Sequence, residues 1–267
     1  MKQHKHKKRF GQNFLNNQRI IDQIVASIRP RAEQHLIEIG PGEAALTKPL
    51  LEIVKKLDII EIDNDLIRPL TERFSDYPAF NLHHTDALTF DYSTLMDSNK
   101  QEKSLRIVGN LPYNISSPLM FHLLTFADNI LDMHFMLQKE VVDRITSPTG
   151  LKSYGRLSVM MQYSCDVESL FDVAPDNFTP PPKVTSAIVR LIPYKQKPFK
   201  AKCDETFAKL VKQSFSQKRK TLRNNLKGML NSEQIENIGI EPNIRAERLN
   251  IEAFVKLSDA LFSLEEN

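Results

Sequence analysis

The sequence is poor in cysteine and has no long apolar run. Of its 267 residues only Cys165 and Cys203 are cysteines, too few for a disulfide framework or a zinc site. No apolar segment approaches the roughly 20 residues that span a membrane. The Lys- and His-rich N-terminus also lacks the apolar core of a secretory signal. We therefore expect a cytoplasmic protein with no metal centre and no membrane partner.

The residues that are present are typical of a folded protein. Hydrophobic residues make up 41% of the chain and charged residues 26%, a balance that excludes extensive disorder. A chain of this length can bury the core of one large α/β domain and still carry a small appendage.

Positive charge is concentrated in two segments, although the net charge is only +3. Between Lys195 and Lys227 the only acids are Asp204 and Glu205, and the chain after Asn231 is acidic. The first ten residues contain no acid and carry the cations Lys2, Lys5, Lys7, Lys8 and Arg9. Local basic segments bind phosphate backbones. A solvated helix face and a loose terminus would give the same composition, so charge alone leaves both interpretations open.

Strand-like and helical patterns alternate up to Tyr194. Apolar strands that alternate with amphipathic stretches such as Ala44–Lys56 and Asp65–Phe74 predict an α/β fold with a mostly parallel, doubly wound sheet. The short link Pro175–Lys183 favours antiparallel neighbours for the last two strands. The expected strands are His35–Ile39, Leu57–Ile62, Phe80–His84, Leu105–Gly109, Leu131–Leu137, Ser169–Val173 and Val184–Ile192.

A change of composition near Tyr194 predicts a domain boundary. The segment Pro193–Lys202 is rich in Pro and Lys, as linkers are, and helical periodicity follows it in Glu205–Leu230 and Ile251–Leu264. We therefore expect a first domain over residues 1–194 and a small helical, RNA-binding domain over residues 195–267.

A glycine-containing turn after the first strand predicts a nucleotide site. Gly40 and Gly42 let the backbone turn sharply and approach a ligand, and the next helix directs its first N–H groups into the same crevice. Glu61, at the end of the second strand, can accept hydrogen bonds from both ribose hydroxyls. With Ala45 as a third small residue, the spacing also fits NAD-binding enzymes. This motif alone does not decide between NAD and S-adenosylmethionine.

Three further residues favour S-adenosylmethionine over NAD. Glu38 and Pro41 suit a turn around a small cationic ligand better than one around a pyrophosphate. Asp86, at the end of the third strand, can accept a hydrogen bond from an adenine amino group.

The fourth strand ends in the most specific motif of the chain, Asn110-Leu111-Pro112-Tyr113. The amide oxygen of Asn110 and the backbone carbonyl of Leu111 can each accept a hydrogen from an adenine N6 amine, which localises its lone pair and makes it nucleophilic. Pro112 fixes the backbone, and Tyr113 offers a face for base stacking, worth about 1–3 kcal/mol. An ordinary β-turn is the alternative interpretation.

Phe178 precedes three prolines, Pro180, Pro181 and Pro182, which form a stiff extended segment. The segment can hold the ring of Phe178 over the opposite face of the base. A Phe before a proline run also commonly packs in a core, and the sequence leaves this alternative open.

Several segments together resemble a known family, the ribosomal RNA adenine N6,N6-dimethyltransferases, and within it the bacterial small-subunit branch. The resemblance covers nearly the whole chain and rests on Arg9–Leu15, Glu38–Thr47, Asn110–Tyr113, Phe178–Ser186 and Phe215–Leu226. It implies a class I S-adenosylmethionine-dependent methyltransferase with a Rossmann-like sheet of seven strands, the last antiparallel, and a small C-terminal helical domain.

The resemblance also implies roles for matched residues. Asn13 and Leu15 would hold the methionine end of S-adenosylmethionine, Gly40 would line its pocket, Glu61 would bind the ribose and Asp86 the adenine. In the same way, the catalytic positions would be those from Asn110 to Tyr113, with Asn110 touching both cofactor and target amine, and with Tyr113 and Phe178 on either face of the base.

The implied reaction is dimethylation of two adjacent adenosines in the 3′-terminal hairpin loop of 16S rRNA, within an immature 30S subunit, with S-adenosylhomocysteine as product. We expect the chain to act as a monomer. A basic helix over Ser214–Leu226, with Lys218, Arg219, Lys220 and Arg223, favours the small-subunit branch, although Lys218 stands where the family more often has Arg. The alternatives are a 23S rRNA methyltransferase of the antibiotic-resistance type and a ribosome assembly factor without catalytic activity.

Overall fold

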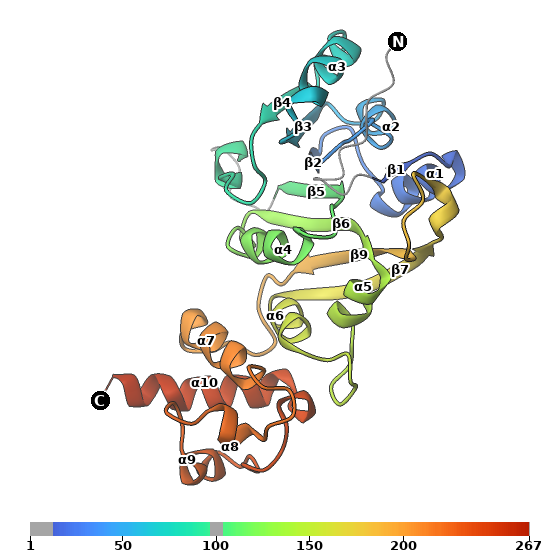
Figure 1. Ribbon diagram of the computed structural model, residues 1–267. Coiled ribbons are helices and arrows are strands. Elements are labelled where there is room, and N and C mark those ends of the chain that lie inside the picture. Colours follow the sequence, from blue (N-terminus) through green and yellow to red (C-terminus); the bar gives the residue numbers. More distant parts are fainter. Residues whose placement is uncertain (1–12, 97–103, 267) are drawn as a thin grey trace. The chain divides into compact units, whose positions relative to one another are not determined.

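The structure is a computed structural model that describes residues 13–96 and 104–266 (Figure 1). The basic segment from Lys2 to Arg9 and the start of the Arg9–Leu15 motif lie outside these residues. The chain forms two compact units, which are described separately below. The first consists of Met1–Val142 and Glu168–Pro193, and the second of Asp143–Val167 and Tyr194–Asn267.

The first unit is built around a seven-stranded sheet whose order is β4-β3-β2-β5-β6-β9-β7. Neighbouring strands from β4 to β6 are parallel, whereas β9 is antiparallel to β6. The sheet strands are β2 (His35–Ile39), β3 (Lys56–Glu61), β4 (Phe80–His84), β5 (Leu105–Asn110), β6 (Ile130–Gln138), β7 (Cys165–Val173) and β9 (Ser186–Pro193). The predicted α/β class and seven strands are therefore confirmed, as is the adjacency of the last two strands.

The remaining elements of this region connect or flank the sheet. They are β1 (Phe14–Leu15), α1 (Gln18–Ile28), α2 (Thr47–Leu51), α3 (Asn64–Phe74), η2 (Tyr92–Leu95), α4 (Ser116–Leu124), α5 (Lys139–Ile145), η3 (Pro175–Asn177) and β8 (Phe178–Thr179). β1 and β8 pair with each other in a separate two-stranded sheet.

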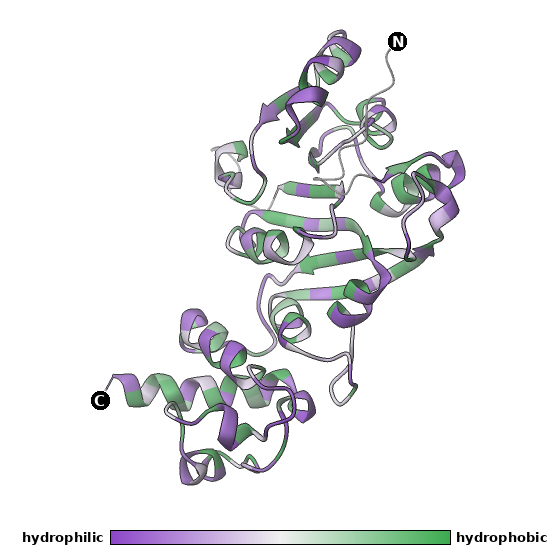
Figure 2. Cartoon of the chain, viewed as in Figure 1, coloured by the Kyte–Doolittle hydropathy of each residue, from purple (hydrophilic) through white to green (hydrophobic). Residues whose placement is uncertain are grey.

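Apolar runs form the central strands because helices bury both faces of the sheet. All five residues of β2 are buried, and Figure 2 shows the central strands as largely hydrophobic. Helix α1 is amphipathic: Ile21, Ile24 and Ile28 are buried along one side. Their burial against the core provides most of the stability of such a helix, since a helix of 11 residues is marginal alone.

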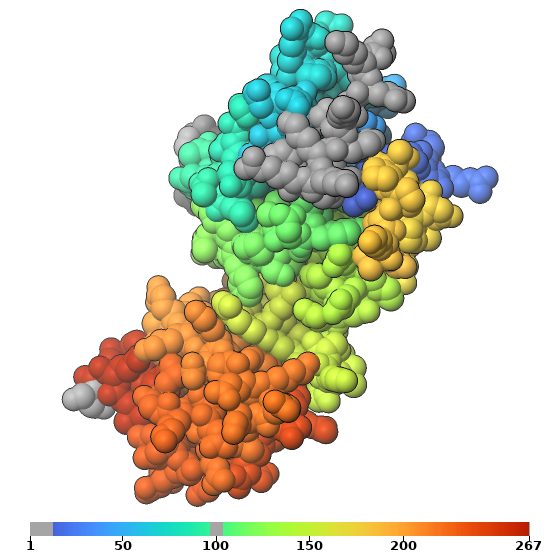
Figure 3. Space-filling model, in the orientation of Figure 1, coloured from blue at the N-terminus to red at the C-terminus, as the bar shows by residue number. Residues whose placement is uncertain are grey.

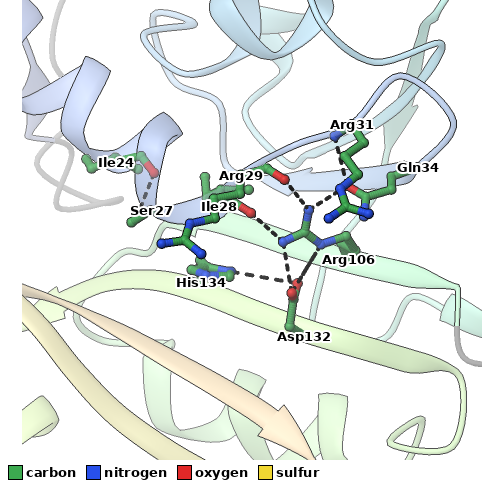
Figure 4. Close-up of polar contacts among 9 residues, drawn as sticks. All are labelled: Ile24, Ser27, Ile28, Arg29, Arg31, Gln34, Arg106, Asp132 and His134. Carbon is green, nitrogen blue, oxygen red and sulfur yellow. Dashed lines mark hydrogen bonds and ion pairs between the residues drawn. The ribbon is translucent and has the colours of Figure 1, made fainter.

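A buried ion pair joins α1 to the sheet (Figure 4). Arg106 on β5 places Nη2 2.8 Å from Oδ2 of Asp132 on β6, and it also donates to the carbonyl of Ile28 at the end of α1. Gln34 accepts another guanidinium hydrogen bond at 2.6 Å. Because every charge here is paired, removal of one partner would leave an uncompensated charge in the core.

His134 lies beside this ion pair on β6. Neither ring nitrogen has a hydrogen-bond partner among the described residues, and Nδ1 is 3.7 Å from the Asp132 carboxylate. Burial lowers the pKa of His134 to about 4; Asp132 opposes this shift, while Arg106 and Arg190 add to it. The imidazole is therefore neutral at physiological pH.

The second unit is helical and has its own core. Its complete helices are α6 (Arg156–Ser164), α7 (Asp204–Ser214), α8 (Leu222–Asn225), α9 (Ser232–Asn237), η4 (Ala246–Arg248) and α10 (Ile251–Glu265). Tyr163 of α6 stacks on Phe207 of α7 with ring centroids 3.9 Å apart. In the described part of the chain, no helix is long and apolar enough to cross a membrane.

The second unit departs from the expected division of the chain at residue 194. Residues Asp143–Val167 belong to it because Tyr154, Val159 and Tyr163 are part of its hydrophobic core. Where the chain divides into independently folding domains stays a prediction.

The continuous basic helix predicted over Ser214–Leu226 is wrong. Helix α7 ends at Ser214, α8 begins only at Leu222, and an exposed turn separates them. The side-chain Nδ2 of Asn225 donates to the backbone carbonyl of Ser214 at 2.7 Å and to that of Gln217 at 3.2 Å. These bonds satisfy backbone groups that a continuous helix would pair internally. The turn also has no apolar residue between Phe215 and Leu222 that could bury a helical face.

Candidate functional site

A cavity of about 310 Å³ lies in the first unit at the carboxyl ends of the parallel strands. In open α/β sheets, ligands bind at this edge, where the order of the strands reverses. The structure brings all the predicted cofactor residues and the predicted tetrapeptide into the lining of this one cavity: Asn13, Leu15, Gly40, Gly42, Glu61, Asp86, Asn110, Leu111, Pro112 and Tyr113.

The turn after β2 has a backbone that favours glycine. Gly40 and Gly42 have φ of +64° and +56°, and the Gly40 N–H donates to the Ile60 carbonyl at 2.9 Å. A Cβ added to Gly42 would lie 2.8 Å from the ring of Phe14. Gly42 is therefore needed both for its backbone conformation and for the close approach of β1, whereas nothing would contact a Cβ on Gly40.

Two carboxylates lie at the base of the cavity. Glu61 accepts the Asp63 N–H at 2.7 Å, and burial raises its pKa. Glu38 accepts the Thr47 hydroxyl at 2.7 Å. Burial raises the pKa of Glu38 to about 7; Thr47 opposes this shift and Glu61 adds to it. A cation bound in this cavity would be attracted by both groups.

Asp86 follows β4 and lines the same cavity. Its Oδ1 accepts the Leu88 N–H at 2.9 Å, and its carbonyl accepts the N–H groups of Thr89 and Phe90. These bonds fix the carboxylate in a turn. The position and orientation suit an acceptor for an exocyclic amine.

Asn110 ends β5 next to a glycine with no space for a side chain. A Cβ on Gly109 would lie 2.7 Å from the Ile39 carbonyl oxygen, so the two central strands approach closely here. The Nδ2 of Asn110 donates to the Asn13 carbonyl at 3.1 Å. Because the nitrogen is used in this way, the amide oxygen of Asn110 is the atom left to accept a hydrogen from a ligand.

The rest of the tetrapeptide is held from two sides. The Leu111 N–H donates to the Met136 carbonyl at 3.2 Å. The hydroxyl of Tyr113 shares a 2.9 Å hydrogen bond with Ser186 of β9, which fixes the ring at the edge of the cavity. Tyr113 is partly exposed and lines the cavity, so its ring is available for stacking.

Phe178 occupies a different position from the other predicted catalytic residues. Its side chain is only 3% exposed and belongs to the hydrophobic core, and it does not line the cavity. In the antiparallel pairing of β1 with β8, Phe178 lies opposite Leu15, and Thr179 lies opposite Phe14. The predicted role of Phe178 in base stacking therefore stays a proposal, and its observed role is to support β1.

Sequence reasoning did not identify the polar residues around this pair of short strands. The side chain of Asn17 donates to Asn177 at 2.7 Å, and that of Asn16 donates to Thr179 at 2.6 Å. These positions have no catalytic signature in the sequence, because each partner lies about 160 residues away along the chain.

The predicted RNA-binding residues lie in the second unit. Lys218, Arg219 and Lys220 are exposed on the turn after α7, and Arg223 is exposed on α8. The segments drawn in orange, which include these four residues, form much of the visible face of that unit in Figure 3. The Nζ of Lys218 donates to the Lys152 carbonyl at 3.2 Å, so the turn is fixed to a neighbouring loop.

Within the described residues, no group of three or more His, Cys, Asp or Glu side chains is arranged to hold a metal ion.

Comparison with known proteins identifies the family. The family model described as "Ribosomal RNA adenine dimethylase" matches residues 3–262. Curated relatives named "Ribosomal RNA small subunit methyltransferase A" include one from Hydrogenovibrio crunogenus, 71% identical over 97% of this chain and 97% of the relative. Another, from Pseudomonas syringae pv. syringae, is 53% identical over 97% of this chain and 96% of the relative.

Two solved structures resemble nearly the whole chain. A dimethyladenosine transferase from Plasmodium falciparum has a TM-score of 0.76 and 26% identity, and the match covers 95% of this chain and 98% of that one. The 23S rRNA methyltransferase ErmE has a TM-score of 0.72 and 25% identity, covering 94% of this chain and 100% of that one. The fold is thus that of a methyltransferase, and the chain belongs to the ribosomal RNA adenine dimethylase family.

Proposed function

We propose that this chain uses S-adenosylmethionine to dimethylate N6 of two adjacent adenosines in the 3′-terminal hairpin loop of 16S rRNA, acting as a monomer on an immature 30S subunit in the cytoplasm. The observation that carries the proposal is the orientation of Asn110. Its amide nitrogen is engaged by Asn13, so its oxygen is presented beside a cavity lined by carboxylates.

The lining of the cavity fits S-adenosylmethionine. A volume of about 310 Å³ is within the range of roughly 300–1,000 Å³ usual for small-molecule sites. Glu61 would hold the ribose, Asp86 the adenine amino group, and Asn13 and Leu15 the methionine end, close to Glu38. When bound, the cofactor supplies an electrophilic methyl group on a positively charged sulfur.

The chain's own residues activate the nucleophile. In the first methylation the oxygens of Asn110 and Leu111 accept the two hydrogens of the adenine amine and localise its lone pair. In the second, one of these oxygens accepts the single hydrogen that remains. Tyr113, fixed by Ser186, stacks on the base, so the amine is held in one orientation. The methylated amine is cationic and releases its proton readily, so no strong general base is required. Phe178 reaches the opposite face of the base only if its ring leaves the core.

RNA recognition is proposed for the exposed cations of the second unit, Lys218, Arg219, Lys220 and Arg223. These cationic side chains contact RNA phosphates, and such contacts do not depend on the base sequence. A hairpin loop is a suitable target because unstacked bases are cheap to extrude into a pocket. The names of the curated relatives support a small-subunit substrate over a 23S one.

The test is methyl transfer from tritiated S-adenosylmethionine to purified 30S particles that lack the modification. Wild-type chain should incorporate label into dimethyladenosine, and Asn110→Ala should lower the rate by about 100-fold or more, as loss of one pre-organised group does in other enzymes. Asn81→Ala, an exposed position on β4, is the matched control and should behave like wild type.

Each alternative gives a different result in this assay. No incorporation by the wild-type chain together with tight 30S binding would indicate an assembly factor. Incorporation into 23S rRNA alone would indicate the resistance-type reaction. Wild-type turnover by Asn110→Ala would remove Asn110 from the mechanism.

A further inference from the structure

We propose that Asn177 is a positioning residue that holds the arm segment, defined as residues 13–17, over the cavity. The inference rests on the proposed use of the cavity for a cofactor. Nothing in the sequence motifs assigns Asn177 a role, and it does not line the cavity itself.

The arm segment and the segment after β7 are joined by more than their short strands. The Asn16 N–H donates to the Asn177 carbonyl at 3.0 Å. The Asn17 Nδ2 donates to Asn177 Oδ1 at 2.7 Å, and the Asn16 Nδ2 to the Thr179 hydroxyl at 2.6 Å. Because a ribbon with two residues in each strand is unstable alone, these side-chain bonds are needed to keep it paired.

Asn177 is itself fixed, so it can serve as an anchor. Its Nδ2 donates to the Ala174 carbonyl at 2.9 Å and to Asp176 Oδ1 at 3.1 Å. Its backbone N–H donates to the same Ala174 carbonyl at 3.2 Å, and only 9% of the residue is exposed. The oxygen of the side chain therefore points toward Asn17 in one defined orientation.

The other end of the arm segment contacts two residues that line the cavity, Asn110 and Gly42. The Asn13 carbonyl accepts the Nδ2 of Asn110, and Phe14 packs directly over Gly42. A displacement of the arm segment would thus remove both the bond that orients Asn110 and part of the cavity lining. Asn177 acts on the site only through this segment.

Asn17 provides a substitution that separates the anchor from helix stability. Its Oδ1 accepts the Arg19 N–H at 3.0 Å and caps α1, while its Nδ2 contacts Asn177. Asn17→Asp keeps an acceptor for the cap, and Asp caps helices as well as Asn does. It removes the donor to Asn177, and rotation of the Asn177 amide to compensate would break the bonds to Ala174 and Asp176.

The test measures hydrogen–deuterium exchange of the Asn16 amide, whose N–H donates to the Asn177 carbonyl, in cofactor-free protein. Asn17→Asp and Asn177→Ala should each exchange about 3- to 10-fold faster than wild type, the effect of one lost hydrogen bond. Asn177→Asp keeps the acceptor for Asn17 and should retain more of the protection than Asn177→Ala. Asn250→Asp is the matched control, because the Oδ1 of Asn250 also caps a helix, α10, by accepting the Ala253 N–H.

The same variants are then titrated with S-adenosylhomocysteine by calorimetry. The Kd of each should rise by a similar factor. The midpoint of thermal unfolding of Asn17→Asp should stay within the range of the control. Unchanged exchange in Asn17→Asp overturns the anchor, and this holds even if Asn177→Ala fails to fold. Faster exchange with an unchanged Kd overturns the positioning role. If wild type does not bind S-adenosylhomocysteine, the proposed function fails, whereas the exchange data still decide whether Asn177 holds the arm segment.

Discussion

Two buried groups of the first unit, His134 and Glu38, should give its stability opposite dependences on pH. His134 is neutral in the fold because burial lowers its pKa from 6.5 to about 4, whereas the unfolded chain takes up a proton below pH 6.5. The free energy of unfolding should therefore fall as pH falls from 6.5 to 4. The loss is about 3 kcal/mol, since each factor of ten in proton affinity corresponds to about 1.4 kcal/mol.

Glu38 acts in the other direction. Its pKa in the fold is raised from 4.5 to about 7 by burial, so the folded chain takes up a proton below pH 7 and the unfolded chain only below pH 4.5. This contribution is fully present below pH 4.5 and is lost as pH rises through 7. Its size is again about 3 kcal/mol.

Between pH 4.5 and 6.5 the pH dependences that His134 and Glu38 give to the free energy of unfolding of the wild-type chain cancel each other. His134→Leu, which breaks no hydrogen bond of the ring because none is formed among the described residues, should become more stable as pH falls from 7 to 4.5, relative to wild type. Glu38→Gln should become less stable over the same range, relative to wild type. Each difference should reach about 3 kcal/mol.

The assay is urea denaturation followed by far-ultraviolet circular dichroism at half-unit intervals from pH 4.5 to 8. Differences from wild type cancel the contributions of all other titrating groups, among them Asp58. Burial raises the pKa of Asp58, but His35 and His83 lower it by more, so its pKa lies below the ordinary value. Curves of both variants that run parallel to wild type would show that neither group has the protonation state argued for here.

The remaining predictions concern packing and RNA. Gly42→Ala should destabilise the first unit by about 1–3 kcal/mol and weaken S-adenosylhomocysteine binding, because its Cβ meets Phe14. Gly40→Ala has open space around its Cβ, so it should lose only about 1–2 kcal/mol of stability, through backbone strain. Thermal unfolding measures both losses of stability. Arg106→Met should cost about 3–5 kcal/mol in urea unfolding by leaving a buried carboxylate unpaired, and a second substitution, Asp132→Leu, should restore much of it. Replacing residues 218–220 by Ala should reduce the slope of log affinity for 30S particles against log salt by about 2–3; an unchanged slope would show that this turn does not contact RNA.

The sheet and the cavity could be predicted because their signals are local. Strands such as Leu36 to Ile39 are apolar except for Glu38, a pattern typical of a sheet covered on both faces, and the residues that follow each parallel strand meet at one edge. The positions of Gly40, Glu61, Asp86 and Asn110 in one cavity follow from this rule and from the parallel order of the strands.

The errors and omissions arise from contacts between distant segments. The end of α7 depends on Asn225, which a helical pattern cannot reveal because the residue bonds backbone carbonyls 8 and 11 positions earlier. The burial of Phe178 depends on β1 at the other end of the chain. The assignment of Tyr154 and Tyr163 to the helical unit depends on an aromatic core shared with Phe207 and Phe254.

The pairing of β1 with β8 has a consequence for biosynthesis. Asn16 and Thr179 are 163 residues apart, so a chain still being translated exposes its arm segment long before the partner strand exists. An incomplete chain that stops before Asn177 already contains every strand-end residue of the cavity but lacks β8 and the Asn177 side chain, which hold the arm segment from its other side. Closure of the cavity is therefore among the last events in the maturation of the first unit, and fragments released early by translational arrest should remain open.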